Sequence, residues 1–367
     1  MELFQPDNFS KAKIQFNKCG DNTKHFLKIL ERYFDNPEIV GVYQVDRAEI
    51  QTQNYKIIVR DFEETKTILL KKYIVSADNK QTEFYLNFLV LLQKKSVAVS
   101  TVLKTLQGES TATIDGKMYS LFEFMAGDHF FPLEQGLANV AMSMAKMHVA
   151  FNEFDNEYVN QIDTLSQMGY YPFNVIKKYT EQDLSVYEEK IKNKDKKEKI
   201  EKNVLTKLPL FKEAAREIEK NKERIARLPA KIIHSDFHPH NVLMDNNKVK
   251  AIIDFENVRI GQQARDIAFA IYKFGRQFFT GSMSVEEVKL KANRLQDLFI
   301  THYDKIRPLS NEEVELLLIL AKDTFIRKLL FVLKGVYDEG NYLWINDLPK
   351  HIVAIDEINY FWPHNHG

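Results

Sequence analysis

The chain has 367 residues, and its 51 lysines and arginines are balanced by 51 aspartates and glutamates, so the formal net charge is zero. That balance creates no overall field to attract nucleic acid or an acidic membrane surface, and neither is expected as a partner. A chain of this length can bury a large core, and it fits two lobes better than one compact domain.

The cysteine and glycine contents exclude further classes. Cys19 is the only cysteine, which excludes an internal disulfide framework and a zinc site built from cysteines. Glycine occurs 13 times, about half its usual share of ~7%, which argues against glycine-rich dinucleotide-binding folds. The start of the sequence lacks a basic-then-apolar signal, and no apolar run reaches the ~18 residues that span a bilayer. We therefore expect a cytoplasmic protein.

The N-terminal part of the chain alternates short apolar runs with turn residues. These patterns predict a helix at 21–34, strands at 39–45, 54–60 and 67–73, a helix at 80–93, and strands at 97–103 and 118–124. The residues that follow are typical of a link to a mostly helical remainder. We therefore expect an α+β chain with a small β-rich lobe over 1–126 and a large, mainly helical lobe over 127–367.

Long stretches of the second part have helical periodicity. Helices are predicted at about 134–151, 288–303 and 311–336. Between 180 and 224 the charged residues have mixed signs. Such a stretch suits a solvated helix with i,i+4 ion pairs better than a nucleic-acid site.

The segment 232–256 carries the most specific pattern in the chain. An apolar strand leads into a loop in which Asp236 and Asn241 are five residues apart, and a second strand, a turn and a third strand end at Asp254. The protein-kinase catalytic loop has the same Asp-to-Asn spacing. A carboxylate such as Asp236 can orient a hydroxyl and accept its proton. Magnesium prefers carboxylate and amide oxygens, so Asn241 and Asp254 are candidate ligands of Mg²⁺ beside the phosphates of ATP.

A simpler interpretation exists for each of these residues taken alone. Aspartate and asparagine are ordinary turn residues, and one Asp-x-x-x-x-Asn match is common in a long chain. His234, two residues before Asp236, could be a core histidine without function. The whole arrangement of His-x-Asp, asparagine, hairpin and Asp-Phe is much rarer, and it favours phosphoryl transfer.

At these residues the chain resembles the aminoglycoside phosphotransferase and choline kinase superfamily, which includes homoserine and methylthioribose kinases. Those proteins have His-Gly-Asp-x-His-x-x-Asn, a hydrophobic hairpin, Ile-Asp-Phe or Ile-Asp-Trp, and then Gly-x-x-x-x-Asp-Leu-Ala. Here the last element runs from Gly261 to Ala268, and Ser235 replaces the usual glycine. We expect little effect from that serine, because serine fits many loop conformations. The resemblance is strong over 231–275 and weaker from about 40 to 150.

The resemblance implies a two-lobed, protein-kinase-like fold that uses ATP and Mg²⁺ to phosphorylate a hydroxyl of a small molecule of the aminoglycoside, choline, homoserine or sugar type. It implies that Asp236 is the catalytic base and that His234 and Asp266 support the loop. The alternative for Asp266 is a plain helix-start acid, favoured by the helix dipole. The superfamily's Leu-Ala-x-Leu-His ending is matched by the residues that lead to His148.

A kinase-like small lobe needs a strand lysine for the phosphates and a helix glutamate to steady it. Lys71 and Lys72 point to opposite faces of their strand, and relatives commonly read apolar-Leu-Lys-x-Tyr, which favours Lys71 and leaves Lys72 as the alternative. Glu83 is the partner candidate, unless it is an ordinary surface residue. Glu123 and Met125 lie at the predicted hinge, where backbone groups would pair with adenine.

The loop that should cover the phosphates, 46–53, contains no glycine. Backbone amides approach phosphates less freely past side chains. This favours an alternative from another class, a catalytically weak or inactive nucleotide-binding protein with a kinase fold. A protein kinase is disfavoured, because the chain passes from Asp254 to Gly261 with little room for an activation segment. The sequence does not indicate the acceptor, ATP or GTP preference, or oligomeric state.

Overall fold

The computed structural model describes residues 16–19, 23–45, 52–73, 79–167, 171–279 and 283–362. These residues form two compact units: one contains 132–239 and the residues from 257 onward, and the other contains the residues up to 131 together with 240–256. The predicted α+β class, with an N-terminal antiparallel sheet and a mostly helical C-terminal part, is confirmed. The segment 240–256 returns to the N-terminal unit, which no local sequence pattern indicates.

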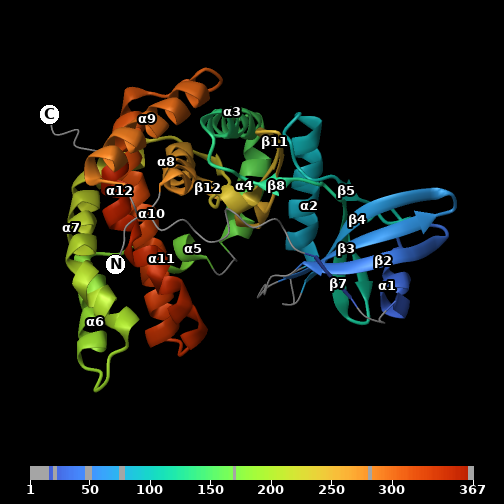
Figure 1. Cartoon of the computed structure of the whole chain (residues 1–367), viewed down its shortest axis with the longest axis horizontal. Coiled ribbons are helices and arrows are strands. Elements are labelled where there is room, and N and C mark those ends of the chain that lie inside the picture. The colour runs from blue at the N-terminus through green and yellow to red at the C-terminus, as the bar shows by residue number, and fades with distance from the viewer. Residues whose placement is uncertain are drawn as a thin grey trace. The chain divides into compact units, whose positions relative to one another are not determined.

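The N-terminal unit is built on an antiparallel sheet with the strand order β1-β2-β3-β4-β7-β5, and β6 pairs with β7 (Figure 1). The strands are β1 (Phe16–Lys18), β2 (Pro37–Val45), β3 (Thr52–Asp61), β4 (Glu64–Tyr73), β5 (Val102–Leu103), β6 (Ala112–Ile114) and β7 (Lys117–Glu123). Two helices accompany the sheet, α1 (Thr23–Leu30) and α2 (Asn79–Lys94).

The two helices cover opposite faces of the sheet, because side chains alternate along a strand. On β4, Ile68 and Leu70 belong to the core that includes Phe26 of α1. Leu69 instead packs with Leu86 of α2. The residue after Leu70 returns to the α2 face, and this alternation separates the two candidate lysines.

A hairpin of β10 (Val242–Asp245) and β11 (Lys248–Ile252) completes this unit, and β10 also pairs with β8 (Asp128–His129). Asn246 and Asn247 connect its strands with positive φ angles of 47° and 65°. Asparagine tolerates that conformation better than most residues, and two such residues give the tight turn that matches strand twist. The Ile252 N–H also donates to the Ala98 carbonyl at 2.7 Å, which ties the hairpin to the N-terminal chain.

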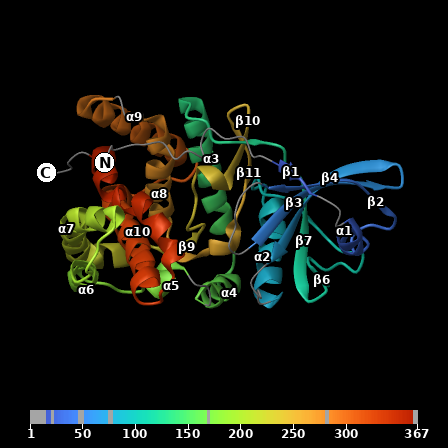
Figure 2. The same ribbon diagram turned by 60° about the horizontal axis from the view of Figure 1, so that its bottom comes forward.

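The other unit is mainly helical. Its main helices are α3 (Glu134–Phe151), α4 (Asn156–Ser166), α5 (Pro172–Val175), α6 (Glu181–Lys192), α7 (Lys199–Arg227), α8 (Gln263–Gly275), α9 (Val285–Asp304), α10 (Asn311–Tyr337), α11 (Leu348–Ile352) and α12 (Ala354–Phe361). A two-stranded sheet joins β9 (Ala230–Ile233) and β12 (Arg259–Gln262). Helix α10 packs against α7, α8 and α12 (Figures 1 and 2).

The helix starts follow from capping chemistry. Ser284 and Ser310 each form a capping box with a glutamate three residues later, which satisfies two backbone N–H groups that a helix start leaves without partners.

The charge-rich stretch 180–224 forms α6 and most of α7, with i,i+4 ion pairing between Glu188 and Lys192. No helix among the described residues is long and apolar enough to cross a membrane.

One strand prediction differs from the structure, and two short strands have no prediction. The expected strand at 97–103 is reduced to β5, with an isolated bridge from Val99 to Ile252. The short strands β6 and β8 were not predicted. Strands of two or three residues have too few alternating positions to produce a periodic signal.

Candidate active site

The loop that contains Asp236 is fixed by the buried carboxylate of Asp266. Asp266 is 1% exposed, and its oxygens accept the backbone N–H groups of His234 at 2.6 Å and Ser235 at 2.8 Å. The side chain of His234 is fully buried, and its Nδ1 lies 3.4 Å from the backbone N of Asp236. These contacts set the direction in which the chain leaves β9 and presents Asp236.

Ser235 has a φ of 71°. Residues other than glycine adopt this left-handed region at a cost of roughly 1–2 kcal/mol. The glycine that relatives have here therefore has a physical reason, and the expectation that serine would fit without consequence is not supported. The hydrogen bond from the Ser235 N–H to Asp266 helps to hold the strained backbone.

A buried histidine completes the support. His148 of α3 lies with its Nε2 3.2 Å from Asp266 and its Nδ1 2.6 Å from the hydroxyl of Tyr303. Burial lowers the pKa of His148, although Asp266 opposes that shift. The imidazole is therefore neutral, with Nε2–H donating to Asp266 and Nδ1 accepting from Tyr303. The superfamily-like ending at His148 was the sequence signal for this contact.

Asp236 lies between two basic side chains of the same unit. Lys328 Nζ is 3.1 Å from its Oδ1, and His238 Nε2 is 3.4 Å from its Oδ2. Burial alone would raise the pKa of Asp236, but the ammonium charge of Lys328 and the contact with His238 more than offset it and hold that pKa well below its usual value. Burial lowers the pKa of His238 itself, so we assign the larger part of this effect to Lys328. Asp236 is therefore an ionised carboxylate at neutral pH.

Lys328 was not identified from the sequence. It lies on α10, 92 residues beyond Asp236, in a stretch that local periodicity describes only as a buried helix. The available signal was weak: Arg327 and Lys328 interrupt the apolar run between Phe325 and Leu333.

Asn241 and Asp254 lie at the same end of the β10–β11 hairpin. Val242 pairs with Ile252, and the Asn241 carbonyl accepts the N–H of Ile253 at 2.9 Å. Asn241 is 6% exposed, whereas Asp254 is exposed and has a φ of 65°. Positive φ outside glycine is concentrated at functional sites, where surrounding structure holds the strain.

The chemistry of these two side chains fits a hard cation. One offers a neutral amide oxygen and the other a carboxylate, and Mg²⁺ usually combines one or two carboxylates with water and phosphate oxygens. Within the part of the chain that is described, no group of three or more histidine, cysteine, aspartate or glutamate side chains could hold a metal ion alone. A cation held by Asn241 and Asp254 would take its remaining ligands from water or from a bound molecule.

Lys71 forms an ion pair with Glu256, two residues beyond Asp254. Burial would lower the pKa of Lys71, but the Glu256 carboxylate more than compensates and raises it. The predicted pairing with Glu83 is not the one found, because Glu83 accepts a hydrogen bond from Thr111 at 2.7 Å. Glu256 comes from the returning segment 240–256, so strand and helix patterns of the N-terminal lobe could not identify it.

We expect Lys71→Met to raise the KM for ATP, or to slow transfer, by about 10–100-fold, the effect of removing one charged hydrogen bond to phosphate. Lys72 lies on the opposite face of β4 and should tolerate the same substitution with much smaller effect. Steady-state kinetics of both variants measure the difference. Equal losses in the two variants would contradict the assignment of Lys71.

The predicted hinge follows β7. The backbone N–H of Glu123 donates to Thr101 at 2.9 Å, and that of Phe124 donates to Thr67 at 3.2 Å. These amides therefore form hydrogen bonds inside the unit, and Met125 follows directly.

The glycine-free phosphate loop was predicted over 46–53, and its residues 46–51 lie outside the described part of the chain.

Comparisons with known proteins agree with this geometry. Residues 49–309 match the model of the phosphotransferase enzyme family. Homoserine kinase from Neisseria meningitidis is 36% identical over 98 residues, which are 26% of this chain and 29% of that protein. Homoserine kinase from Afipia carboxidovorans is 24% identical over 289 residues, 78% of this chain and 74% of that protein. The higher-identity matches span only about a third of their proteins' length.

Among solved structures, spectinomycin phosphotransferase in complex with ADP and spectinomycin aligns with 94% of this chain and 100% of its own, at a TM-score of 0.64 and 12% identity. This likeness establishes the fold. The family match covers well over half of the chain and confirms the resemblance inferred from the sequence. The chain belongs to the phosphotransferase enzyme family.

Proposed function

We propose that the chain transfers the γ-phosphate of ATP to a hydroxyl of a small molecule, with Asp236 as the catalytic base. The observation that carries this proposal is the carboxylate of Asp236, which contacts Lys328 and His238 and lies on a loop fixed by Asp266. Membership of the phosphotransferase family supports the reaction class. The names of relatives, homoserine kinase and spectinomycin phosphotransferase, support a small-molecule acceptor.

Asp236 would act mainly by orientation. A carboxylate with a lowered pKa is a weak base, but it accepts a hydrogen bond from an alcohol and directs the oxygen lone pair at phosphorus. In a loose transition state the hydroxyl loses its proton late, so positioning contributes more than strong deprotonation. Lys328 and His238 would keep Asp236 ionised and in place.

The nucleotide would be held by residues of the N-terminal unit. Asn241 and Asp254 would bind Mg²⁺, which when bound neutralises charge on the transferring phosphoryl group. Lys71, oriented by Glu256, would pair with the phosphates. The carbonyl of Glu123 and the backbone of Met125 would face adenine, and Glu83 would contribute indirectly by holding α2 to Thr111.

A transfer assay tests the proposal. Labelled ATP and Mg²⁺ are incubated with the chain and a panel of L-homoserine, amino alcohols, sugars and aminoglycosides. We expect Mg²⁺-dependent label transfer to at least one alcohol. Nucleotide binding without transfer to any member would instead support the catalytically weak or inactive kinase-fold protein, and the absence of both would overturn the proposal.

The metal assignment predicts the behaviour of Asp254→Ala. This variant should lose the Mg²⁺-dependent part of the thermal stabilisation by ADP, which for the wild type reaches about 2.7 kcal/mol at 100 times the dissociation constant. The apoprotein should remain folded, because Asp254 is exposed. Asp245→Ala, at the turn end of the same hairpin, is the matched control. Equal stabilisation by ADP with and without Mg²⁺ in the wild type would show that the assignment is wrong.

A further inference from the structure

Three arginines surround one aromatic ring in the helical unit. The guanidinium carbons of Arg259, Arg265 and Arg327 lie 5.4, 5.2 and 5.5 Å from the ring centre of Phe173. They come from β12, the start of α8 and α10, so the fold brings together cations that are far apart in sequence. We call Arg259, Arg265 and Arg327 the arginine cluster.

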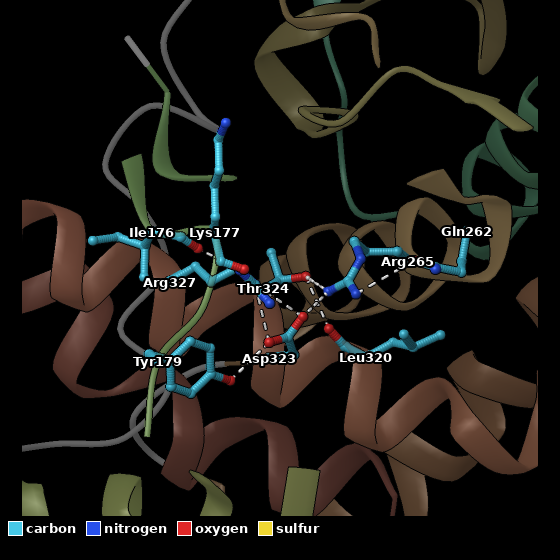
Figure 3. Close-up of polar contacts among 9 residues, drawn as sticks. All are labelled: Ile176, Lys177, Tyr179, Gln262, Arg265, Leu320, Asp323, Thr324 and Arg327. Atoms are coloured by element: carbon cyan, nitrogen blue, oxygen red, sulfur yellow. Dashed lines mark hydrogen bonds and ion pairs between the residues drawn. The ribbon is translucent and has the colours of Figure 1, made fainter. Parts of the chain in front are cut away.

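One buried carboxylate lies between two of the three arginines. Arg265 and Arg327 share Asp323, whose carboxylate they approach from opposite sides (Figure 3). Burial would raise the pKa of Asp323, but the two arginines lower it to about 2. Arg259 donates to neutral oxygens, the side chain of Asn174 at 3.2 Å and the carbonyl of Asn257 at 3.4 Å.

The cluster retains hydrogen-bonding capacity as well as positive charge. Nη2 of Arg327 and Nε of Arg265 have no hydrogen-bond partner among the residues that the structure describes. The side chain of Arg327 is 17% exposed and that of Arg265 is 10% exposed. Both side chains are therefore largely sheltered from bulk water, and this shelter strengthens their interaction with an opposite charge. Each retains enough exposed surface for a ligand to reach it.

The arginine cluster and Asp236 belong to the same compact unit, and α8 and α10 contribute residues to both. Lys328, which contacts Asp236, follows Arg327 in sequence, and its Nζ lies 4.6 Å from the ring centre of Phe269. Arg265 is one turn before Phe269 on α8, about 6 Å along the helix axis. The same two helices thus supply the ammonium group that contacts Asp236 and two guanidinium groups of the arginine cluster.

We infer that the arginine cluster and Lys328 form a subsite for the carboxylate of the phosphate acceptor. This inference rests on the proposed function and deepens it by assigning the acceptor to carboxylate-bearing alcohols. A guanidinium group matches the planar geometry of a carboxylate and binds it with charge-assisted hydrogen bonds. A polycationic acceptor such as an aminoglycoside would place ammonium groups against this surface and be repelled.

Three pairs of alcohols that differ only by one carboxylate provide the test: L-homoserine and 3-amino-1-propanol, L-serine and ethanolamine, and L-threonine and 1-amino-2-propanol. Each is assayed as acceptor with ATP and Mg²⁺, with kanamycin as the polycation. In the pair that is used best, we expect kcat/KM to favour the carboxylate by at least about 10-fold, since one charged hydrogen bond contributes that much. Preference for the decarboxylated member or for kanamycin would overturn the inference.

Binding is measured in parallel, so that the result does not depend on turnover. If no pair is phosphorylated, the carboxylate member of a pair should still raise the Tm of the wild-type protein more than its decarboxylated partner. Equal stabilisation, or none, would overturn the subsite. Failure of the proposed function is distinguishable, because it would abolish phosphoryl transfer to every alcohol, whereas failure of the subsite would remove only the preference for the carboxylate member of a pair.

Variants separate ligand binding from a purely structural network. Arg327→Gln and Arg265→Gln should each raise the KM for the carboxylate acceptor by about 10–100-fold. They should leave the KM for ATP and the KM for the decarboxylated partner unchanged. Arg216→Gln, which removes an exposed arginine paired with Glu181 on the same unit, is the control. A loss shared equally by both members of a pair would indicate only structural damage and would count against the inference.

Discussion

Replacing Asp236 with asparagine is expected to lower kcat by roughly 10²–10⁴-fold, the usual contribution of a positioned acid–base group. Asparagine keeps the size of the side chain but loses the charge that accepts the proton of the alcohol. ADP with Mg²⁺ should stabilise this variant as it does the wild type, because Asn241 and Asp254 are unchanged. The measurement is kcat with the acceptor identified by the transfer assay.

The exposed Asp297 of α9 provides the control, since Asp297→Asn should leave kcat unchanged. Turnover of Asp236→Asn close to that of the wild type would remove Asp236 from the catalytic role.

A pH profile of kcat adds a second readout. Because the pKa of Asp236 is held low, its protonation should not limit kcat near pH 5–6, well above the ordinary carboxyl value of ~3.9. Lys328→Met should raise that pKa and move the acidic loss of activity to higher pH.

The fold could be predicted where its signal is local. Alternating apolar residues predicted β3, β4 and β7, and a continuous helical period predicted α3 and α10. The hairpin that carries Asn241 and Asp254 was predicted because two apolar runs flank a turn with Asn246 and Asn247. In each element, the residues that determine the structure are close together in sequence.

The site could be predicted only as far as local motifs reach. Asp236, Asn241 and Asp254 form one motif, whereas Lys328 and Glu256 become neighbours of Asp236 and Lys71 only through folding. In the sequence alone, a charged residue that interrupts an apolar helix or follows a strand can be a surface residue, a structural ion pair or part of a site. The partner of a charged residue depends on which elements pack together, and periodicity does not encode that choice.

The support loop shows why such long-range contacts have large effects. Asp266 connects three segments: it accepts two backbone N–H groups after β9 and contacts His148 of α3. Each of these partners is buried or half-buried. A buried donor without an acceptor costs about 1–3 kcal/mol, so a single carboxylate here affects both the stability of the unit and the position of Asp236.

Asp266→Ala is therefore expected to lower the free energy of unfolding by about 3–5 kcal/mol, because several buried donors lose their acceptor at about 1–3 kcal/mol each. The Tm and kcat should fall together, because the strained backbone at Ser235 loses its hydrogen bond and Asp236 loses its fixed direction. Thermal unfolding and steady-state kinetics measure the two effects.

Asp266→Asn separates geometry from charge in this network. Its amide oxygen can accept one of the two backbone N–H groups, while its amide nitrogen faces a donor, so it should recover part of the stability that alanine loses. Asp297→Ala, on the surface of α9, should change the free energy of unfolding by no more than about 0.5 kcal/mol. If Asp266→Ala lost activity at unchanged Tm, Asp266 would have a direct role in the reaction, because a residue that acts only by holding the loop cannot be removed without loosening it.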